Sequence, residues 1–360
     1  MMLIFFTFIS LCAAVLAVPC VQAQTYGPPV YETVYTPRVE RMEAIPEEQY
    51  VALAVYKDML VAGGYVNGCM LHLFDRESGE YVTGFARAGN DAGEFSARPF
   101  FQADEKSGRL TVVPAGTRRV IVYDLEKILD EQPAVSGEFT FRFPLNIYNA
   151  VLSERGLLAN GACASDSLRF RMGFVDPESM SVKWSSVYAD IPFPYSDGIE
   201  YRIKRNLAGS MFAWHFNPER RRIVAGSGYG MVLEIFDVDS VVKPAAVRYF
   251  LDAGSYGVEH RTALFPVIVP TGETVLGYRW ITSSDRYIYT LNFCDRNGRR
   301  LGNGMSEISV FDWQGNPVAL LEGLPRLLCI ASGRDGCLFG IVQPEDRSTR
   351  YIVRIRTNFL

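Results

Sequence analysis

The sequence predicts an all-β fold, a six-bladed β-propeller of four-stranded antiparallel blades, and three observations support this prediction. The first is a unit that recurs about six times, in which polar turns separate strand-like apolar runs. The third run of each unit ends in an aromatic residue or Val followed by Asp. These runs lie at residues 70–75, 120–124, 172–176, 232–237 and 308–312, and a last copy at 351–356 lacks the Asp. Repeated all-strand units of this kind indicate blades arranged radially around a central channel.

The second observation places the innermost strand of each blade. Six apolar runs are each followed by a turn rich in Asp, Gly, Ser or Asn-Pro, which is the residue chemistry of tight turns. The runs cover residues 51–56, 100–103, 148–152, 212–216, 280–282 and 328–331. Their near-continuous apolar character is typical of central strands that are buried on both faces. Longer repeats around residues 190–210 and 250–275 indicate insertions between blades.

The third observation concerns the two ends of the chain. Residues 24–30 have the composition of a linker, and the following residues alternate between apolar and polar like a strand. The last blade has room for about three strands before Leu360. We therefore expect the N-terminal strand, near residues 31–39, to pair with residues 351–356. This pairing would close the ring and remove two exposed sheet edges, so residues 24–360 form one propeller domain.

The N-terminus predicts export. Residues 3–18 form one apolar run, and Val21-Gln22-Ala23 then supplies small residues at the −3 and −1 positions of a cleavage site. This is the pattern of a signal peptide over residues 1–23. Lipid attachment at Cys20 is an alternative, which Pro19 directly before it disfavours. No other apolar run is long enough to span a bilayer. We expect a periplasmic or extracellular protein with no membrane span after removal of the signal.

Composition narrows the classes of partner and cofactor. The net charge of −4 gives no general case for binding nucleic acid. The cysteines beyond the signal lie far apart and lack the spacing of metal ligands, so we expect no metal and no cofactor. They are Cys69, Cys163, Cys294, Cys329 and Cys337. The last two flank a predicted hairpin turn, and they either pair across it or remain buried thiols.

One blade carries a recognisable motif. Residues 89–95 read Gly-Asn-Asp-Ala-Gly-Glu-Phe, Pro99 follows, and residues 119–124 read Arg-Val-Ile-Val-Tyr-Asp. This pattern resembles the NHL repeat, with Pro114 standing where an Asp or its neighbour is usual. Together with the export signal and five more divergent blades, it is similar to the bacterial TolB-like six-bladed propeller family, over residues 30–360. The resemblance implies a propeller fold and brings no catalytic residues with it.

Three arginines are the main candidate binding residues. Arg98, Arg279 and Arg326 lie at or just before predicted innermost strands, so we expect them at one mouth of the channel. Arginine suits bidentate binding of carboxylate or phosphate. Loops expected on the same face add Arg118, Arg119, Arg202, Lys204, Arg205, His260 and Arg261. The sequence therefore predicts a site for an anionic small molecule, a glycan or a protein segment. The alternative is that these arginines pair with carboxylates of the same loops.

Two function classes remain open. One is a binding or interaction module of the bacterial envelope or the extracellular space. The other is a propeller enzyme, such as a lyase, lactonase or glycan hydrolase, with its site in the central channel. No nucleophile elbow is present, and the predicted innermost strands offer Asn149 and little else to a hard cation. We therefore assign no catalytic residue, and His215 is interpreted as a core or channel-lining histidine rather than a base.

The export signal makes the first prediction. The mature protein should begin at Gln24, because the small residues Val21 and Ala23 precede that position. Mass spectrometry of the protein purified from its own host measures this directly. A first residue of Cys20 carrying a diacylglyceryl group would contradict it and establish a lipoprotein instead.

Overall fold

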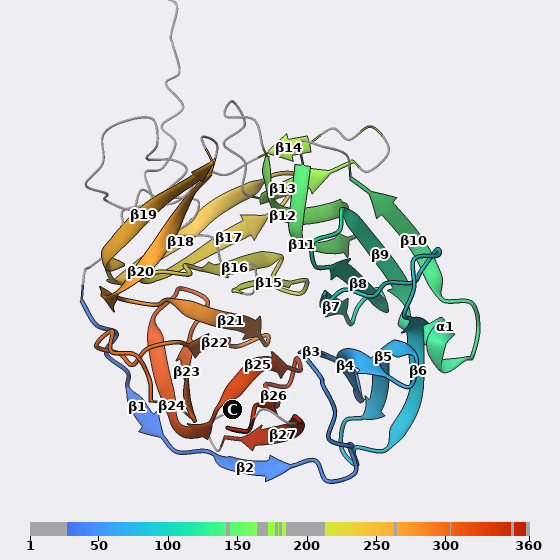
Figure 1. Cartoon of the computed structure of the whole chain (residues 1–360), viewed down its shortest axis with the longest axis horizontal. Helices are drawn as coiled ribbons and strands as arrows, with labels where there is room; N and C mark the ends of the chain where they lie inside the picture. The colour runs from blue at the N-terminus through green and yellow to red at the C-terminus, as the bar shows by residue number, and fades with distance from the viewer. Residues whose placement is uncertain are drawn as a thin grey trace, which may run out of the picture.

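The computed structural model describes residues 27–141, 145–163, 172–176, 179, 182–184, 213–262, 265–302, 304–346 and 349–357. The signal peptide predicted for residues 1–23 and the candidate residues Arg202, Lys204 and Arg205 lie outside these ranges. Within them the chain is almost entirely β-strand, with one short helix, α1 (Leu125–Leu129). Figure 1 shows the strands arranged in blades around a central axis. No helix in the described ranges has the length and apolar character needed to cross a bilayer.

The first three blades each contain four antiparallel strands. Blade 1 consists of β3 (Ala52–Tyr56), β4 (Met59–Val66), β5 (Cys69–Asp75) and β6 (Tyr81–Arg87). Blade 2 consists of β7 (Pro99–Asp104), β8 (Arg109–Pro114), β9 (Arg119–Asp124) and β10 (Val135–Thr140). Blade 3 consists of β11 (Leu145–Ser153), β12 (Gly156–Cys163), β13 (Met172–Val175) and β14 (Val182–Trp184).

The other three blades follow the same plan, so the six-bladed architecture is confirmed. Blade 4 consists of β15 (Trp214–Asn217), β16 (Arg222–Gly226), β17 (Met231–Val238) and β18 (Val242–Leu251). Blade 5 consists of β21 (Tyr278–Ser283), β22 (Ile288–Asn292), β23 (Met305–Phe311) and β24 (Pro317–Pro325). Blade 6 consists of β25 (Leu327–Ser332), β26 (Leu338–Val342) and β27 (Tyr351–Arg356), completed by β2 (Arg38–Arg41). An added hairpin, β19 (Gly254–Thr262) and β20 (Phe265–Thr274), stands between blades 4 and 5.

The innermost strands β3, β7, β11, β15, β21 and β25 overlap all six runs that the sequence predicts as innermost. Each is the first strand of its blade, and each runs in the same direction along the channel. Residues just before these strands therefore lie at one mouth of the channel, and residues just after them lie at the other. Along the sequence, residues that precede an innermost strand alternate with residues that follow one. The common strand direction places these two groups at opposite mouths of the channel.

The N-terminal segment closes the ring, but it does so with two short strands rather than one. β2 pairs antiparallel with β27, with Val39 opposite Ile355, as the closure prediction requires. β1 (Thr33–Tyr35) instead pairs in parallel with β24 of blade 5. Pro37 lies between the two strands and has no amide hydrogen to donate to a ladder, which ends the first pairing. Figure 1 shows both strands along the outer edge of blades 5 and 6.

Arg354 joins the closing blade to blade 1. Its side chain is 5% exposed, although it lies on a strand near the rim of the ring. Nη1 donates to Glu77 Oε1 at 2.8 Å, and Nη2 donates to the backbone oxygens of Arg76 at 2.5 Å and Glu77 at 3.0 Å. Three oxygens of the β5–β6 turn are therefore held by one guanidinium group of β27.

Replacing Arg354 should weaken the contact between blade 6 and blade 1, which we call the seam of the ring. Arg354→Leu removes the charge-assisted hydrogen bonds and leaves the two carbonyls unsatisfied, so we expect the free energy of unfolding to fall by about 2–3 kcal/mol. Urea denaturation measures the change. Arg38→Leu is the control, because Arg38 pairs with Glu40 at the surface and its side chain is 79% exposed; it should cost less than about 0.5 kcal/mol. Equal costs for the two variants would contradict the role of Arg354.

A polar cluster lies beneath the N-terminal segment on blade 5. The hydroxyl groups of Tyr31 and Ser309 are 2.6 Å apart, and Asn292 Nδ2 donates to Ser309 Oγ at 2.7 Å. Glu307, at a bulge in β23, lies in the same region. Burial is the main cause that raises the Glu307 pKa to about 7, and the negative charges of Asp295 and Glu322 act in the same direction against Arg296.

This raised pKa gives the fold a pH dependence. The folded protein binds the Glu307 proton more tightly than the unfolded chain, whose carboxyl has the ordinary pKa of 4.5. The stabilisation from the bound proton is therefore complete below about pH 4.5 and is lost as the pH rises through about 7. After allowance for solvent screening, Glu307→Gln should be more stable than the natural protein by about 1–2 kcal/mol at pH 8, and equal to it at pH 4.

Urea denaturation at the two pH values tests this prediction. The exposed Glu80 provides the control, since Glu80→Gln should leave the pH dependence as it is. A Glu307→Gln variant that loses stability between pH 4 and pH 8 as steeply as the natural protein would show that another group is responsible.

The described thiols are unpaired. Cys69, Cys294, Cys329 and Cys337 are free, so the alternative of a Cys329–Cys337 disulfide is wrong. The register of blade 6 explains this result, because Cys329 lies opposite Ile341 rather than near the hairpin turn. Cys329 is fully buried instead, and burial raises the pKa of its thiol to about 12.

Candidate functional site: the two mouths of the central channel

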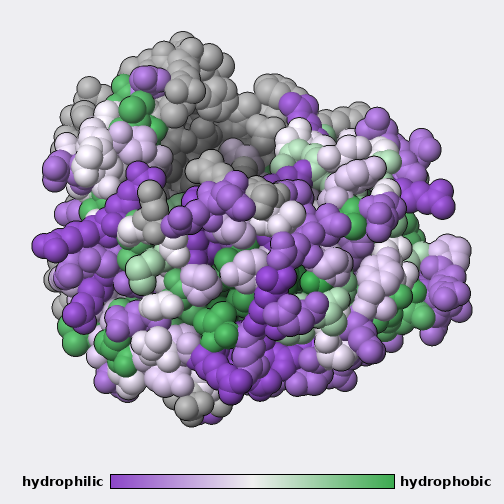
Figure 2. All heavy atoms as spheres, turned by 60° about the horizontal axis from the view of Figure 1, so that its bottom comes forward, coloured by the Kyte–Doolittle hydropathy of each residue, from purple (hydrophilic) through white to green (hydrophobic). Residues whose placement is uncertain are grey.

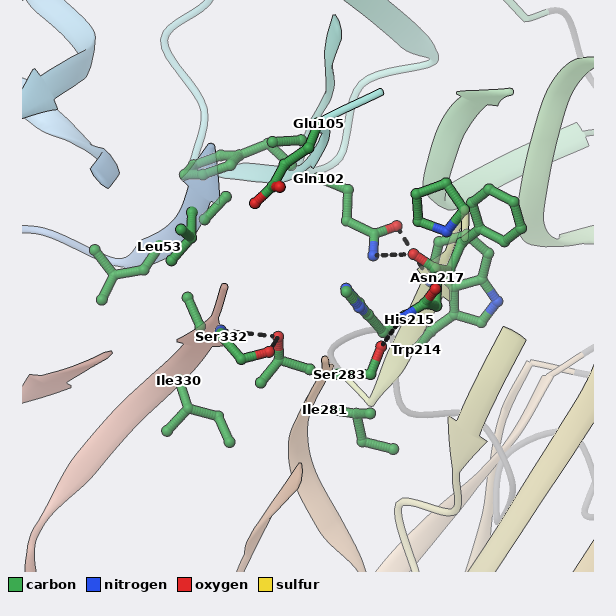
Figure 3. A pocket seen from close by; sticks show the side chains of 18 of the residues that line it. Leu53, Gln102, Glu105, Trp214, His215, Asn217, Ile281, Ser283, Ile330 and Ser332 are labelled. Carbon is green, nitrogen blue, oxygen red and sulfur yellow. Dashed lines mark hydrogen bonds between the residues drawn. The ribbon is translucent and has the colours of Figure 1, made fainter. Parts of the chain in front are cut away.

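The central channel contains a cavity of about 80 Å³ that all six innermost strands line. Its wall combines aromatic side chains, among them Phe101, Trp214 and Trp280, with polar ones such as Gln102 and His215. Figure 3 shows Gln102, Trp214 and His215 around the lumen, with Glu105 at its edge. The cavity is therefore a mixed apolar and polar compartment rather than a filled core.

Side-chain hydrogen bonds fix the wall of this cavity. Gln102 uses both ends of its amide on the backbone of Phe216, since Nε2 donates to the Phe216 oxygen and Oε1 accepts from the Phe216 nitrogen, each at 3.4 Å. Asn217 Nδ2 donates to Ser283 Oγ at 3.3 Å. These bonds join blade 2 to blade 4 and blade 4 to blade 5, as Figure 3 shows.

The three predicted arginines start from equivalent places in their blades. Arg98 directly precedes β7, Arg326 directly precedes β25, and Arg279 is the second residue of β21. Arg98 Nη2 donates to the backbone oxygen of Val51 at 3.3 Å. The guanidinium group of Arg279 lies 5.6 Å from the centre of the Phe293 ring. All three therefore belong to the mouth at which the innermost strands begin.

The charges at this mouth act on one another. Burial is the largest cause that lowers the pKa of Arg279, and the positive charges of Arg326, Arg98 and Arg350 lower it further, whereas Cys329 opposes them. Burial likewise lowers the pKa values of Arg98 and Arg350. The hydrogen bonds agree with this mutual effect, because Arg98 donates to the backbone oxygen of Val51 and Arg350 donates to that of the adjacent residue Tyr50. We call Arg98, Arg279, Arg326 and Arg350 the basic mouth.

Arg350 is a member that sequence reasoning missed. It precedes β27, which is not an innermost strand, so an argument based on the starts of innermost strands passes over it. Its Nη1 donates to the backbone oxygen of Tyr50 at 2.8 Å, and its Nε donates to Gln343 Oε1 at 2.9 Å. The backbone nitrogen of Gln343 in turn donates to the oxygen of Arg326.

The other predicted residues lie apart from this group. Arg119 donates to Glu138 Oε1 at 2.8 Å and to the backbone oxygens of Glu94 and Asp91, so it holds the NHL-like loop in place. Arg118 is exposed in the β8–β9 turn. Neither arginine is among the charges that act on Arg279. His260 and Arg261 lie in β19, in the hairpin between blades 4 and 5.

The opposite mouth carries a second charged group that sequence reasoning also missed. Glu105, Glu219 and Asp285 follow the innermost strands of blades 2, 4 and 5, and Arg334 follows that of blade 6. The guanidinium group of Arg334 lies 2.9 Å from Glu219, 3.7 Å from Asp285 and 3.9 Å from Glu105. We call these four residues the acidic mouth. They occupy the segments after innermost strands, which the sequence analysis interpreted only as tight turns.

His215 lies within the channel, between the two mouths. Its side chain contributes to the cavity wall, as Figure 3 shows, and burial lowers its pKa to about 3. The imidazole is therefore neutral at physiological pH. Within the described part of the chain, its Nδ1 has no hydrogen-bond partner. A search of the same residues finds no group of His, Cys, Asp and Glu side chains placed to hold a metal ion.

The sequence matches a family model described as TolB-like 6-blade propeller-like, over residues 50–321. The chain belongs to this TolB-like propeller family. The resemblance drawn from the NHL-like blade is thereby confirmed.

Solved structures agree with this assignment at the level of the fold. A member of the DUF4221 family from Bacteroides vulgatus has a TM-score of 0.52 and 12% identity, and the match covers 90% of this chain and 96% of that one. A candidate exported protein from Bacteroides fragilis has a TM-score of 0.52 and 12% identity, with 94% of each chain covered. No curated protein matches this TolB-like propeller.

Proposed function

We propose that this TolB-like propeller is an exported bacterial binding module whose basic mouth holds an anionic ligand or an anionic segment of a partner. Export is supported by the pattern at residues 1–23, and the similar Bacteroides fragilis protein carries a description as a candidate exported protein. The channel mouth of a propeller is a rigid platform on which loops from several blades converge.

The observation that carries this proposal is the convergence of positive charge at the basic mouth. Arg279 and Arg326 form no ion pair with a carboxylate of the described residues, and Arg279 is partly buried beside other guanidinium groups. Such a cluster destabilises the unliganded protein, because like charges repel and the charged groups are partly desolvated. An anion that enters the cluster removes the repulsion and forms charge-assisted hydrogen bonds.

The guanidinium groups and the neighbouring Phe293 ring indicate which classes of anion the basic mouth would bind. Guanidinium groups are planar donors that match carboxylate and phosphate oxygens in pairs. The Phe293 ring, which is 38% exposed, lies beside Arg279 and offers an apolar face. Acidic sugars and carboxylate-bearing peptide segments combine an anionic group with a surface that can pack on such a ring. We therefore favour these ligands over inorganic anions.

Removing one charge at a time tests the proposal. Isothermal titration with galacturonate, citrate and inorganic phosphate at low salt measures the affinity. Each charge-assisted hydrogen bond contributes about 1.5–3 kcal/mol, so Arg279→Met and Arg326→Met should each weaken binding by about 10- to 100-fold. Because the substitutions relieve repulsion, the unliganded variants should be at least as stable as the natural protein.

Arg356→Met is the matched control. Arg356 is an exposed arginine of the rim that pairs with Glu40 at 2.6 Å, so its loss should leave anion binding unchanged. The proposal fails if the three variants weaken binding equally, or if Arg279→Met and Arg326→Met bind the anions as tightly as the natural protein.

A further inference from the structure

We propose that the acidic mouth is a second binding site, which takes the ammonium or guanidinium group of a small organic cation and holds Arg334 as its internal occupant. This site lies at the far end of the channel from the basic mouth. Glu105 lies seven positions after Arg98 along the extended strand β7, a distance of about 23 Å. Binding at one mouth therefore involves none of the side chains of the other.

Arg334 does not satisfy the hydrogen-bonding capacity of all three carboxylates of the acidic mouth. Of its three contacts, only the one to Glu219, at 2.9 Å, is within hydrogen-bonding distance, whereas Asp285 and Glu105 lie at 3.7 and 3.9 Å. Asp285 Oδ1 is buried and has no hydrogen-bond partner in the described part of the chain. Three carboxylates from three blades thus surround the guanidinium group of Arg334. Glu105 is also bonded to the backbone nitrogen of Lys57 and lies in the field of Arg76, so Asp285 is the carboxylate that Arg334 leaves least satisfied.

A second, independent observation comes from His215, inside the channel. Its buried Nδ1 is also without a partner among the described residues, and Figure 3 shows its side chain among the residues that surround the lumen. Gln102 and Asn217 are bonded to backbone or hydroxyl groups, whereas His215 keeps one ring nitrogen without a hydrogen-bond partner among the described residues. The cavity that a ligand would reach from the acidic mouth is therefore lined in part by a neutral imidazole.

The cavity has the size and lining for a short alkyl chain. Its volume of about 80 Å³ is several times the ~10–15 Å³ that one water requires on the same measure. Phe101 and Trp280 line it, and aromatic faces pack well against methylene groups and attract nearby cations. A ligand with a cationic head at the carboxylates and an apolar stem in the cavity fits both parts.

Arg334 is placed to move aside. It lies in the turn between β25 and β26, flanked by Gly333 and near Gly336, and its side chain is 45% exposed. Rotation of that side chain into solvent would vacate the carboxylates without moving a strand. The neighbouring Asp335 is held by Arg76 at 3.2 Å, so it stays outside the site. An incoming cation thus competes with a guanidinium group that belongs to the protein itself.

Titration with n-butylammonium tests this inference, because Trp214 and Trp280 line the cavity and report on it by fluorescence. The natural protein should bind this probe weakly. Arg334→Ala should bind it at least ten-fold more tightly, since the competing group is gone. Adding Asp285→Asn to Arg334→Ala should reverse most of that gain. The neutral analogue n-butanol should bind none of these proteins measurably.

Arg155→Ala is the matched control, because Arg155 has a similarly exposed side chain, 46% against 45%, and an ion pair with Asp239. Its affinity for n-butylammonium should equal that of the natural protein. Should Arg334→Ala fail to unfold cooperatively, Arg334→Gln replaces it. The inference is overturned if removal of Arg334 leaves the affinity unchanged, if n-butanol binds as tightly as n-butylammonium, or if Asp285→Asn has no effect.

Discussion

The backbone hydrogen bonds between β2 and β27 join the two ends of the chain within one sheet, and the ring depends on them. Without β2, blade 6 would expose the edge of β27, and blades 6 and 1 would meet without a covalent connection. Arg354 and Arg350 both act at this seam, one through the β5–β6 turn and the other through the oxygen of Tyr50. Arg350 also belongs to the basic mouth. The proposed ligand site and the closure of the ring therefore share a side chain.

The channel carries opposite charges at its two ends, because the innermost strands all run in the same direction. Positive side chains gather where these strands begin, and three carboxylates gather where they end. Between them lies an apolar and aromatic wall with a neutral imidazole. Partly buried charges at the ends of such a passage are screened less than charges on an open surface. Figure 2 shows a contrasting exterior, on which hydrophilic residues are spread over much of the visible face and apolar ones form small groups.

Sequence reasoning recovered the parts of this structure that local chemistry determines. The turns after the innermost strands located all six of them, and the offset of Arg98, Arg279 and Arg326 from those strands gave the mouth to which they belong. It could not recover contacts that depend on how blades approach one another. The reach of Arg334 across the channel and the entry of Arg350 into the basic mouth are of this kind. Pro37 was visible, but its effect in dividing the closing segment between two blades depends on the positions of β24 and β27.

The amide of Gln102 links blade 2 directly to blade 4, so part of the channel wall does not rely on blade 3 for its shape. Blade 3 lies between blades 2 and 4 in the sequence. On the channel side, however, blades 2 and 4 are hydrogen-bonded directly to each other. Blade 3 contributes Asn149 to the wall of the cavity, whereas the hydrogen bonds between Gln102 and Phe216 connect blade 2 to blade 4 without it. A substitution in blade 3 therefore reaches the lumen through Asn149 and leaves this brace between blades 2 and 4 in place.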